Sequence, residues 1–317
     1  MTIQKKLLVL MDGSERSIET VNYIKAFIPL GENTRIVLFH VWSGMPEAYR
    51  ELGADLACAG EVGQLRNQET ERQSKIRMYL ETARKMLITG GFPEASIEIK
   101  FHLLEKGVAR DIITEARNGY SAVILRRRGM GALASIILGS VAVKLLQSLT
   151  FIPMIIVGQA PPAKKILLAV DSSESSMKAV EFTAAWMGGH DYEACIFHAI
   201  PGLGLIHFDL AEMRRACTGG AAADTGIEAF KLKIARMFQT IRDRLVSSGF
   251  DSEKIFEKIV TGVLSRSEAI VKEAEAGGYG AIVVGRRGLS KVDAFFMGRV
   301  GHKIVYGGNR FTVWVVP

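Results

Sequence analysis

An internal duplication constrains the fold of this chain more than any other feature of its sequence. The apolar run and acidic residue at 7–12 (LLVLMD) return as residues 166–171 (ILLAVD). Each copy later carries two glycines ten residues apart, Gly129 and Gly139 in the first and Gly288 and Gly298 in the second. These landmarks keep one offset of 159 residues, so the chain is predicted to hold two related domains.

The length and a proline-containing segment place the boundary between the two domains. A chain of 317 residues is long enough for two domains that each bury a core. Residues 159–163 (QAPPA) hold two prolines, which cannot donate to a strand ladder. We therefore predict a first domain at 1–158, a linker at 159–163 and a second domain at 164–317.

Short apolar runs alternate with stretches of helical period along both copies. Wholly apolar, β-branched runs are typical of strands buried on both faces and covered by helices, which predicts parallel α/β sheets. The expected strands are 5–11, 35–42, 97–103, 121–126 and 153–158 in the first copy, and 164–170, 193–199, 255–260, 280–285 and 311–316 in the second. Helices are expected at 14–29, 66–89, 108–118 and 138–148, with Met78 and Met86 as core fillers. Long loops are expected at 43–65 and 200–226, and would cover the carboxyl ends of the strands if they are functional.

Composition and charge exclude several classes of protein. With 48% hydrophobic and 23% charged residues, the chain has the composition of a globular protein. The apolar run at 7–11 is too short for a signal peptide or a membrane span, so we expect a cytoplasmic protein without a membrane partner. Cys58, Cys195 and Cys217 lack metal-site spacing and are expected to be free thiols. The net charge of +7 is spread along helices, which argues against nucleic-acid binding.

The first candidate site residues are the carboxylates that follow the first strand of each copy, Asp12 and Asp171. A carboxylate at the carboxyl edge of a parallel sheet can accept hydrogen bonds from a ribose or a base. It can equally cap the helix that follows, and the sequence leaves both interpretations open.

The second candidate lies late in each copy, where glycines separate a strand from a helix. Glycine lets the backbone approach a phosphate, and a helix start directs free amides at an anion. The residues concerned are Arg126, Gly129, Gly139 and Ser140 in the first copy and Gly285, Gly288, Gly298 and Arg299 in the second.

Together these residues resemble the universal stress protein family in its tandem, two-domain form. The resemblance covers essentially the whole chain and implies two Rossmann-like, open, mostly parallel five-stranded sheets flanked by helices. It implies a nucleotide motif Gly-x2-Gly-x9-Gly-Ser/Thr and a backbone contact to adenine at the end of the second strand, here Val41 and Ala199. The ligand implied is ATP or AMP, with Mg²⁺ as an option alongside ATP.

Each copy departs from that motif once. Arg126 replaces the first glycine of the first copy, and its side chain could obstruct the ribose or phosphate path. Arg299 replaces the hydroxyl residue of the second copy, which removes one hydrogen bond that the arginine could restore by pairing with phosphate. We therefore expect the second copy to bind nucleotide better than the first.

The predicted function is a stress-response protein that binds an adenine nucleotide as a sensor or regulator. Beyond Asp12 and Asp171 the sequence shows neither a positioned nucleophile nor metal-binding carboxylates, so at most slow ATP hydrolysis is expected. The alternative is a non-nucleotide interaction module, whose nucleotide motifs have degenerated and which binds a protein partner or an apolar ligand. His40 and His198 are predicted to be packed histidines.

The apolar edge strands 153–157 and 312–316 suggest intramolecular pairing of the two domains, with further homodimerisation left open.

Overall fold

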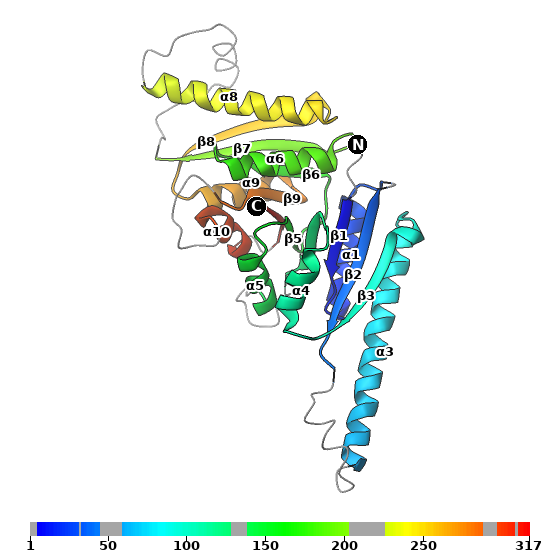
Figure 1. The fold of residues 1–317 in the computed structure, drawn as a ribbon. Helices are drawn as coiled ribbons and strands as arrows, with labels where there is room; N and C mark the ends of the chain where they lie inside the picture. The colour runs from blue at the N-terminus through cyan, green and yellow to red at the C-terminus, as the bar shows by residue number, and fades with distance from the viewer. Residues whose placement is uncertain are drawn as a thin grey trace. The chain divides into compact units, whose positions relative to one another are not determined.

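The chain forms two compact α/β units (Figure 1). The computed structural model describes residues 5–31, 33–44, 59–127, 138–202, 226–287, 297–307 and 310–317. The first unit holds β1 to α5 without Phe27–Pro29, and the second holds Pro153–Pro317 together with Phe27–Pro29. The last strand that originates in the first repeat, β5, is thereby grouped with the second unit.

Four parallel strands form the sheet of the first unit, in the order β3-β2-β1-β4. They are β1 (Lys5–Leu10), β2 (Thr34–Trp42), β3 (Ile97–Leu103) and β4 (Ala122–Arg126). The helices are α1 (Glu15–Phe27), α3 (Ala59–Thr89), α4 (Val108–Ala116) and α5 (Ser140–Ser148). The apolar run of β1 is buried at its centre, as expected for a strand covered on both faces.

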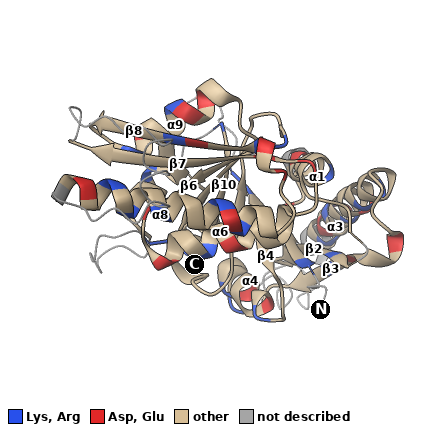
Figure 2. Ribbon diagram, turned by 90° about the horizontal axis from the view of Figure 1, so that it is seen from above, with Lys and Arg blue, Asp and Glu red and all other residues tan. Residues whose placement is uncertain are grey.

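The second unit holds six strands in the order β5-β10-β9-β6-β7-β8, and only β5 is antiparallel to its neighbour. They are β5 (Met154–Val157), β6 (Lys165–Ala169), β7 (Glu193–Pro201), β8 (Ile255–Val263), β9 (Ala281–Gly285) and β10 (Thr312–Val316). The helices are α6 (Glu174–Met187), α8 (Gly226–Ser247), α9 (Arg266–Gly277) and α10 (Arg299–Gly307). Figure 2 shows α6 and α8 on one side of these strands and α9 on the other.

The predicted fold class is confirmed, since each repeat contributes five of the described strands to mostly parallel sheets. The two predicted edge strands contact each other: β5 pairs antiparallel with β10, with Ile155 opposite Trp314. Trp314 is fully buried, so this pairing covers apolar surface that a bare edge would expose. Pairing of the two whole domains across a twofold axis stays a prediction, as do the domain boundaries.

Two expectations about the long helix of the first unit were wrong. Helix α3 begins at Ala59, so residues 59–65, expected in a loop, are helical. Met78, expected in the core, is 62% exposed, because its face of α3 does not pack on the sheet. The face that does pack carries Ile76, Leu80, Ala83 and Leu87, at helical spacing. Of the other expected loop residues, 45–58 and 203–225 lie outside the described parts of the chain.

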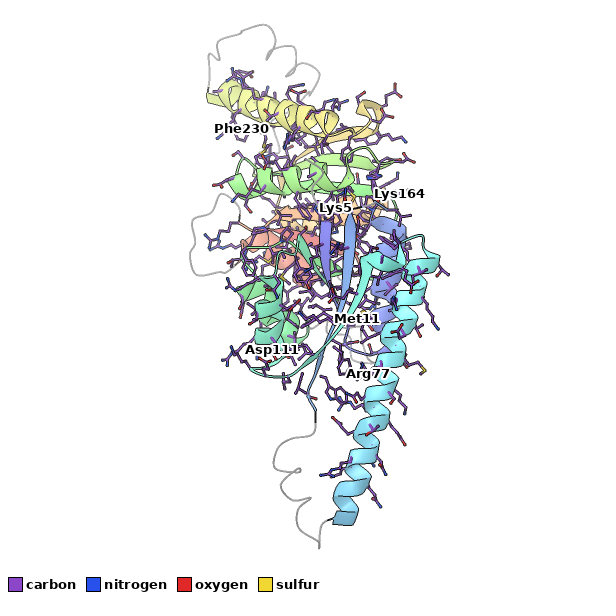
Figure 3. The ribbon with its side chains drawn as sticks, turned by 45° about the vertical axis from the view of Figure 1, so that its right-hand side comes forward. Lys5, Met11, Arg77, Asp111, Lys164 and Phe230 are labelled. Carbon is purple, nitrogen blue, oxygen red and sulfur yellow. The ribbon has the colours of Figure 1, made fainter. Side chains whose placement is uncertain are left out.

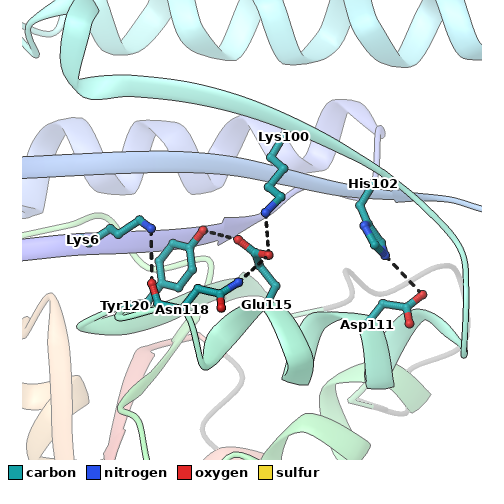
Figure 4. A network of polar contacts seen from close by, with 7 residues as sticks. All are labelled: Lys6, Lys100, His102, Asp111, Glu115, Asn118 and Tyr120. Carbon is teal, nitrogen blue, oxygen red and sulfur yellow. Dashed lines mark hydrogen bonds and ion pairs between the residues drawn. The ribbon is translucent and has the colours of Figure 1, made fainter.

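A polar network ties α4 to the sheet of the first unit (Figure 4). The Glu115 carboxylate accepts hydrogen bonds from Lys100 Nζ at 2.7 Å and from the Tyr120 hydroxyl at 2.6 Å. Burial acts to raise the pKa of Glu115, but these donors outweigh it and the pKa is lowered. The second unit repeats the arrangement with Lys258 and Tyr279 around Glu273. The duplication therefore extends to the contacts that hold α4 in the first unit and α9 in the second.

Candidate functional site

The acidic residues after the first strands organise the turns that lead into helices. Asp171 Oδ1 accepts hydrogen bonds from the Ser173 amide at 3.0 Å and from the Ser173 hydroxyl. Ser173 is itself the N-cap of α6, because its hydroxyl accepts from the Ser176 amide. Asp12 repeats the arrangement with the amide and hydroxyl of Ser14. Capping in the second copy thus belongs to Ser173, and Asp171 supports it from two residues before the cap.

Gly285, the last residue of β9, lies against the first turn of α6. A Cβ built on Gly285 would stand 2.6 Å from the carbonyl carbon of Ser175 and 2.7 Å from the Ser176 amide nitrogen. Both are backbone atoms, which cannot rotate away as a side chain could. The close packing of α6 on β9 therefore explains why a glycine is needed at position 285, whether or not the backbone also approaches a phosphate there.

Arg126 occupies the corresponding place at the end of β4 in the first repeat. Its guanidinium forms an ion pair with Glu19 on α1, and its side chain is only 11% exposed. The arginine that was expected to obstruct a phosphate path is therefore engaged by the neighbouring helix.

A helix begins directly after the last motif glycine of each repeat. Gly139 is the N-cap of α5, whose first residue is Ser140, and α10 begins at Arg299 directly after Gly298. The first amides of a helix have no partner within the helix and carry its positive dipole end. Both starts are therefore suited to an anion. Gly129 and Gly288 lie outside the described residues.

A cavity of about 350 Å³ at the carboxyl ends of the strands of the second unit brings predicted residues together. Asp171, Ala199, Gly285, Gly298 and Arg299 all line it, although they come from four separate segments of the chain. Val41, the first-repeat counterpart of Ala199, lies in β2 opposite His102 of β3. Five of the six site residues predicted for the second copy thus surround one space.

One wall of this cavity was not predicted from the sequence. Phe230, Lys233, Ile234 and Met237 of α8 line it, at the i, i+3, i+4 and i+7 spacing of a single helix face. Figure 3 marks Phe230 in the first turns of α8. This spacing is visible in the sequence and predicts that one face of the helix is buried. It does not predict that this face lines a cavity.

The described lining of the cavity is strongly cationic. Lys233, Arg266, Arg287 and Arg299 line it, and Asp171 is the single carboxylate among the described lining residues. Apolar side chains from β7, α8 and α9 supply much of the rest of the wall. A ligand with a flat apolar part and several negative charges would match this composition.

His198 also lines the cavity, with one ring nitrogen engaged. Its Nδ1 lies 2.7 Å from the Val170 carbonyl, which can only accept, so Nδ1 carries the proton. Burial, the largest influence, lowers the pKa of His198 and keeps the ring neutral. His40 makes the same contact with Met11 in the first repeat, and its pKa is likewise lowered by burial. The described residues contain no group of three or more metal-ligating side chains that could hold an ion.

Bulky side chains occupy the equivalent region of the first unit. Trp42, two residues after His40, is 6% exposed and packs with Phe101 at a ring separation of 5.7 Å. Arg72 and Arg77 of α3, the second of them marked in Figure 3, lie over these two rings. In the second unit the residue two after His198 is the smaller Ile200, which lines the cavity.

Comparison with known proteins identifies the family. The model of the universal stress protein family matches the chain twice, over residues 4–158 and 162–317. The chain belongs to the universal stress protein family. The duplication was predicted from the spacing of the repeated landmarks, and the family from the resemblance of the motif residues. None of the curated proteins matches the chain.

Solved structures of universal stress proteins share the fold of the whole chain. One from Archaeoglobus fulgidus DSM 4304 is 17% identical, with coverage of 99% of this chain and 98% of that one and a TM-score of 0.64. A putative universal stress protein from Pseudomonas aeruginosa UCBPP-PA14 is 17% identical, with coverage of 99% and 93% and a TM-score of 0.53. A universal stress protein in complex with cAMP is 19% identical over 50% of this chain and 97% of that one, with a TM-score of 0.34.

Proposed function

We propose that the second repeat binds an adenine nucleotide, ATP or AMP, and that the protein acts as a sensor or regulator in a cytoplasmic stress response. The observation that supports this most is the cavity that gathers Asp171, Ala199, Gly285, Gly298 and Arg299 beside three further cationic side chains. Its apolar wall suits a base, and the start of α10 suits phosphates. Among the described residues, no helix is both long and apolar enough to cross a bilayer.

The cavity offers little to a metal of its own. One oxygen of Asp171 already accepts two hydrogen bonds, which leaves the other oxygen as the available carboxylate ligand among the described lining residues. Mg²⁺ is often held by one carboxylate together with substrate phosphates, and the site fits that role for Mg²⁺ carried by ATP. We expect binding without rapid turnover, because Asp171 is the single carboxylate among the described lining residues and phosphoryl transfer usually needs carboxylates that hold a metal. Slow hydrolysis and a nucleotide-free interaction role stay as alternatives.

Titration calorimetry of the full chain with ATP and AMP tests this proposal. Lys233→Ala should weaken ATP binding about two- to fivefold, the worth of one exposed charge pair. Lys231→Ala, on the same helix and paired with Glu228, is the matched control and should leave the affinity unchanged. Absence of measurable binding of either nucleotide to the wild-type chain would favour the interaction module instead.

The order in which the two repeats fill is tested by a matched pair of glycine variants. Gly288→Val should abolish the tighter site, because a β-branched side chain resists a close backbone approach, whereas Gly129→Val should spare it. The ordering rests on the bulky Trp42 cluster of the first unit and the cavity of the second. The reverse result, with the tighter site lost in Gly129→Val alone, would show that the first repeat binds first.

A further inference from the structure

The two ends of the second-unit cavity differ in chemistry. Strand β6 lies between β9 and β7, so the strand ends at Gly285 and Ala199 are about 10 Å apart, two strand spacings. Arg299 at the start of α10 lines the cavity with Gly285 and Gly298, which makes the β9 side suited to phosphates. The β7 side carries Ala199 with the apolar wall of α8 and α9, which suits a base.

Arg266, the first residue of α9, lines the cavity at the β7 side. Its Nε donates to the carbonyl oxygen of Ala199 at 3.3 Å, which anchors the guanidinium at the strand end. A guanidinium has five N–H donors and no acceptor, and it keeps its positive charge at every physiological pH. The base end of the cavity therefore presents fixed donors.

Purine bases differ in how they meet such a group. Guanine and hypoxanthine carry the acceptors O6 and N7 side by side, and a guanidinium can donate to both at once. Adenine carries an amine donor in place of O6, which opposes the guanidinium. We propose that Arg266 shifts the base preference of this cavity toward 6-oxo purine nucleotides, an inference that rests on the proposed function and widens the nucleotides it covers.

The first repeat supplies the natural comparison. Helix α4 begins at Val108 in the place where α9 begins at Arg266. An aliphatic side chain offers no donor to a base edge. Arg266→Val thus gives the second repeat the residue of the first. Arg266 is exposed at a helix start, so the change is compatible with folding.

The test compares ATP and GTP binding to the full chain by calorimetry, in the wild type, Arg266→Val and Arg266→Gln. The ratio of the Kd for ATP to the Kd for GTP should fall at least about fivefold in both variants, since that is the lower limit of what one bidentate contact discriminates between bases. Arg236→Ala, on the exposed face of α8, is the control and should keep the wild-type ratio. Circular dichroism checks that each variant is folded.

Each outcome bears on a different claim. If both nucleotides bind and the ratio stays within about twofold of the wild type in both variants, Arg266 does not read the base, while the proposed function stands. If neither nucleotide binds to the wild-type chain, the proposed function and this inference are both overturned.

Discussion

Replacement of Gly285 by alanine is expected to damage both the stability and the ligand site of the second unit. The added methyl group would stand 2.6–2.7 Å from backbone atoms of Ser175 and Ser176, so the first turn of α6 must move. That turn accepts hydrogen bonds from the amides of Asp171 at 3.0 Å and Arg287 at 3.1 Å. Overpacking costs about 1–3 kcal/mol, and weakening one of these bonds adds about 1 kcal/mol.

We therefore expect the free energy of unfolding to fall by about 2 kcal/mol or more, which lowers Tm by about 4–8 °C in a unit of this size. Urea unfolding measures the loss, and ATP titration should show weaker binding, because Asp171 and Arg287 line the cavity. Gly307→Ala is the control, since a Cβ there meets nothing within 4 Å. An unchanged urea midpoint for Gly285→Ala would refute the packing argument. Unchanged ATP affinity in a destabilised variant would show that Asp171 and Arg287 do not contact the nucleotide.

Two further predictions follow from buried titratable groups. The pKa of His198 is lowered from 6.5, chiefly by burial, so the unfolded chain binds a proton more readily and stability should decrease as the pH falls below about 6.5. Urea midpoints at about pH 7.5 and 5.5 measure this, and His198→Gln should reduce the dependence, with a remainder from His40, whose pKa is also lowered by burial. A midpoint that rises on acidification would contradict the prediction. Burial raises the pKa of the Cys195 thiol to about 11, so with Cys58 and Cys217 changed to serine the native protein should resist a thiol-reactive dye until denatured. Rapid labelling of the native protein would show that Cys195 is accessible.

The sequence predicted the parts of the site that lie at the ends of strands. The places of Asp171 and Gly285 follow from the alternation of apolar runs and helices, because the carboxyl ends of parallel strands meet at one edge of a sheet. Ala199 was implied by the resemblance to the family, and Gly298 by the glycine spacing before a helix. The start of α10 at Arg299 follows in the same way from the glycine before it.

The sequence did not predict those features that depend on how segments distant in the chain pack together. The contact between Arg266 and the Ala199 carbonyl depends on the path of the turn between β8 and α9, which local pattern does not determine. The ion pair of Arg126 with Glu19 likewise joins a strand end to a helix face more than a hundred residues earlier. The first turns of α3 contain Gly60 and Gly63, and glycine disfavours a helix, so the local sequence did not indicate that the helix begins at Ala59.

The pairing of β5 with β10 decides where the chain can be divided for study. A fragment that starts at residue 164, at the sequence-predicted domain boundary, would lack Met154–Val157 and leave the β10 edge that carries Trp314 without its neighbour. Such a fragment would tend to aggregate through that edge. A cut before Pro153 keeps the strand with the unit it completes. Supplying residues 153–158 as a separate peptide should rescue the shorter fragment, by adding the missing strand.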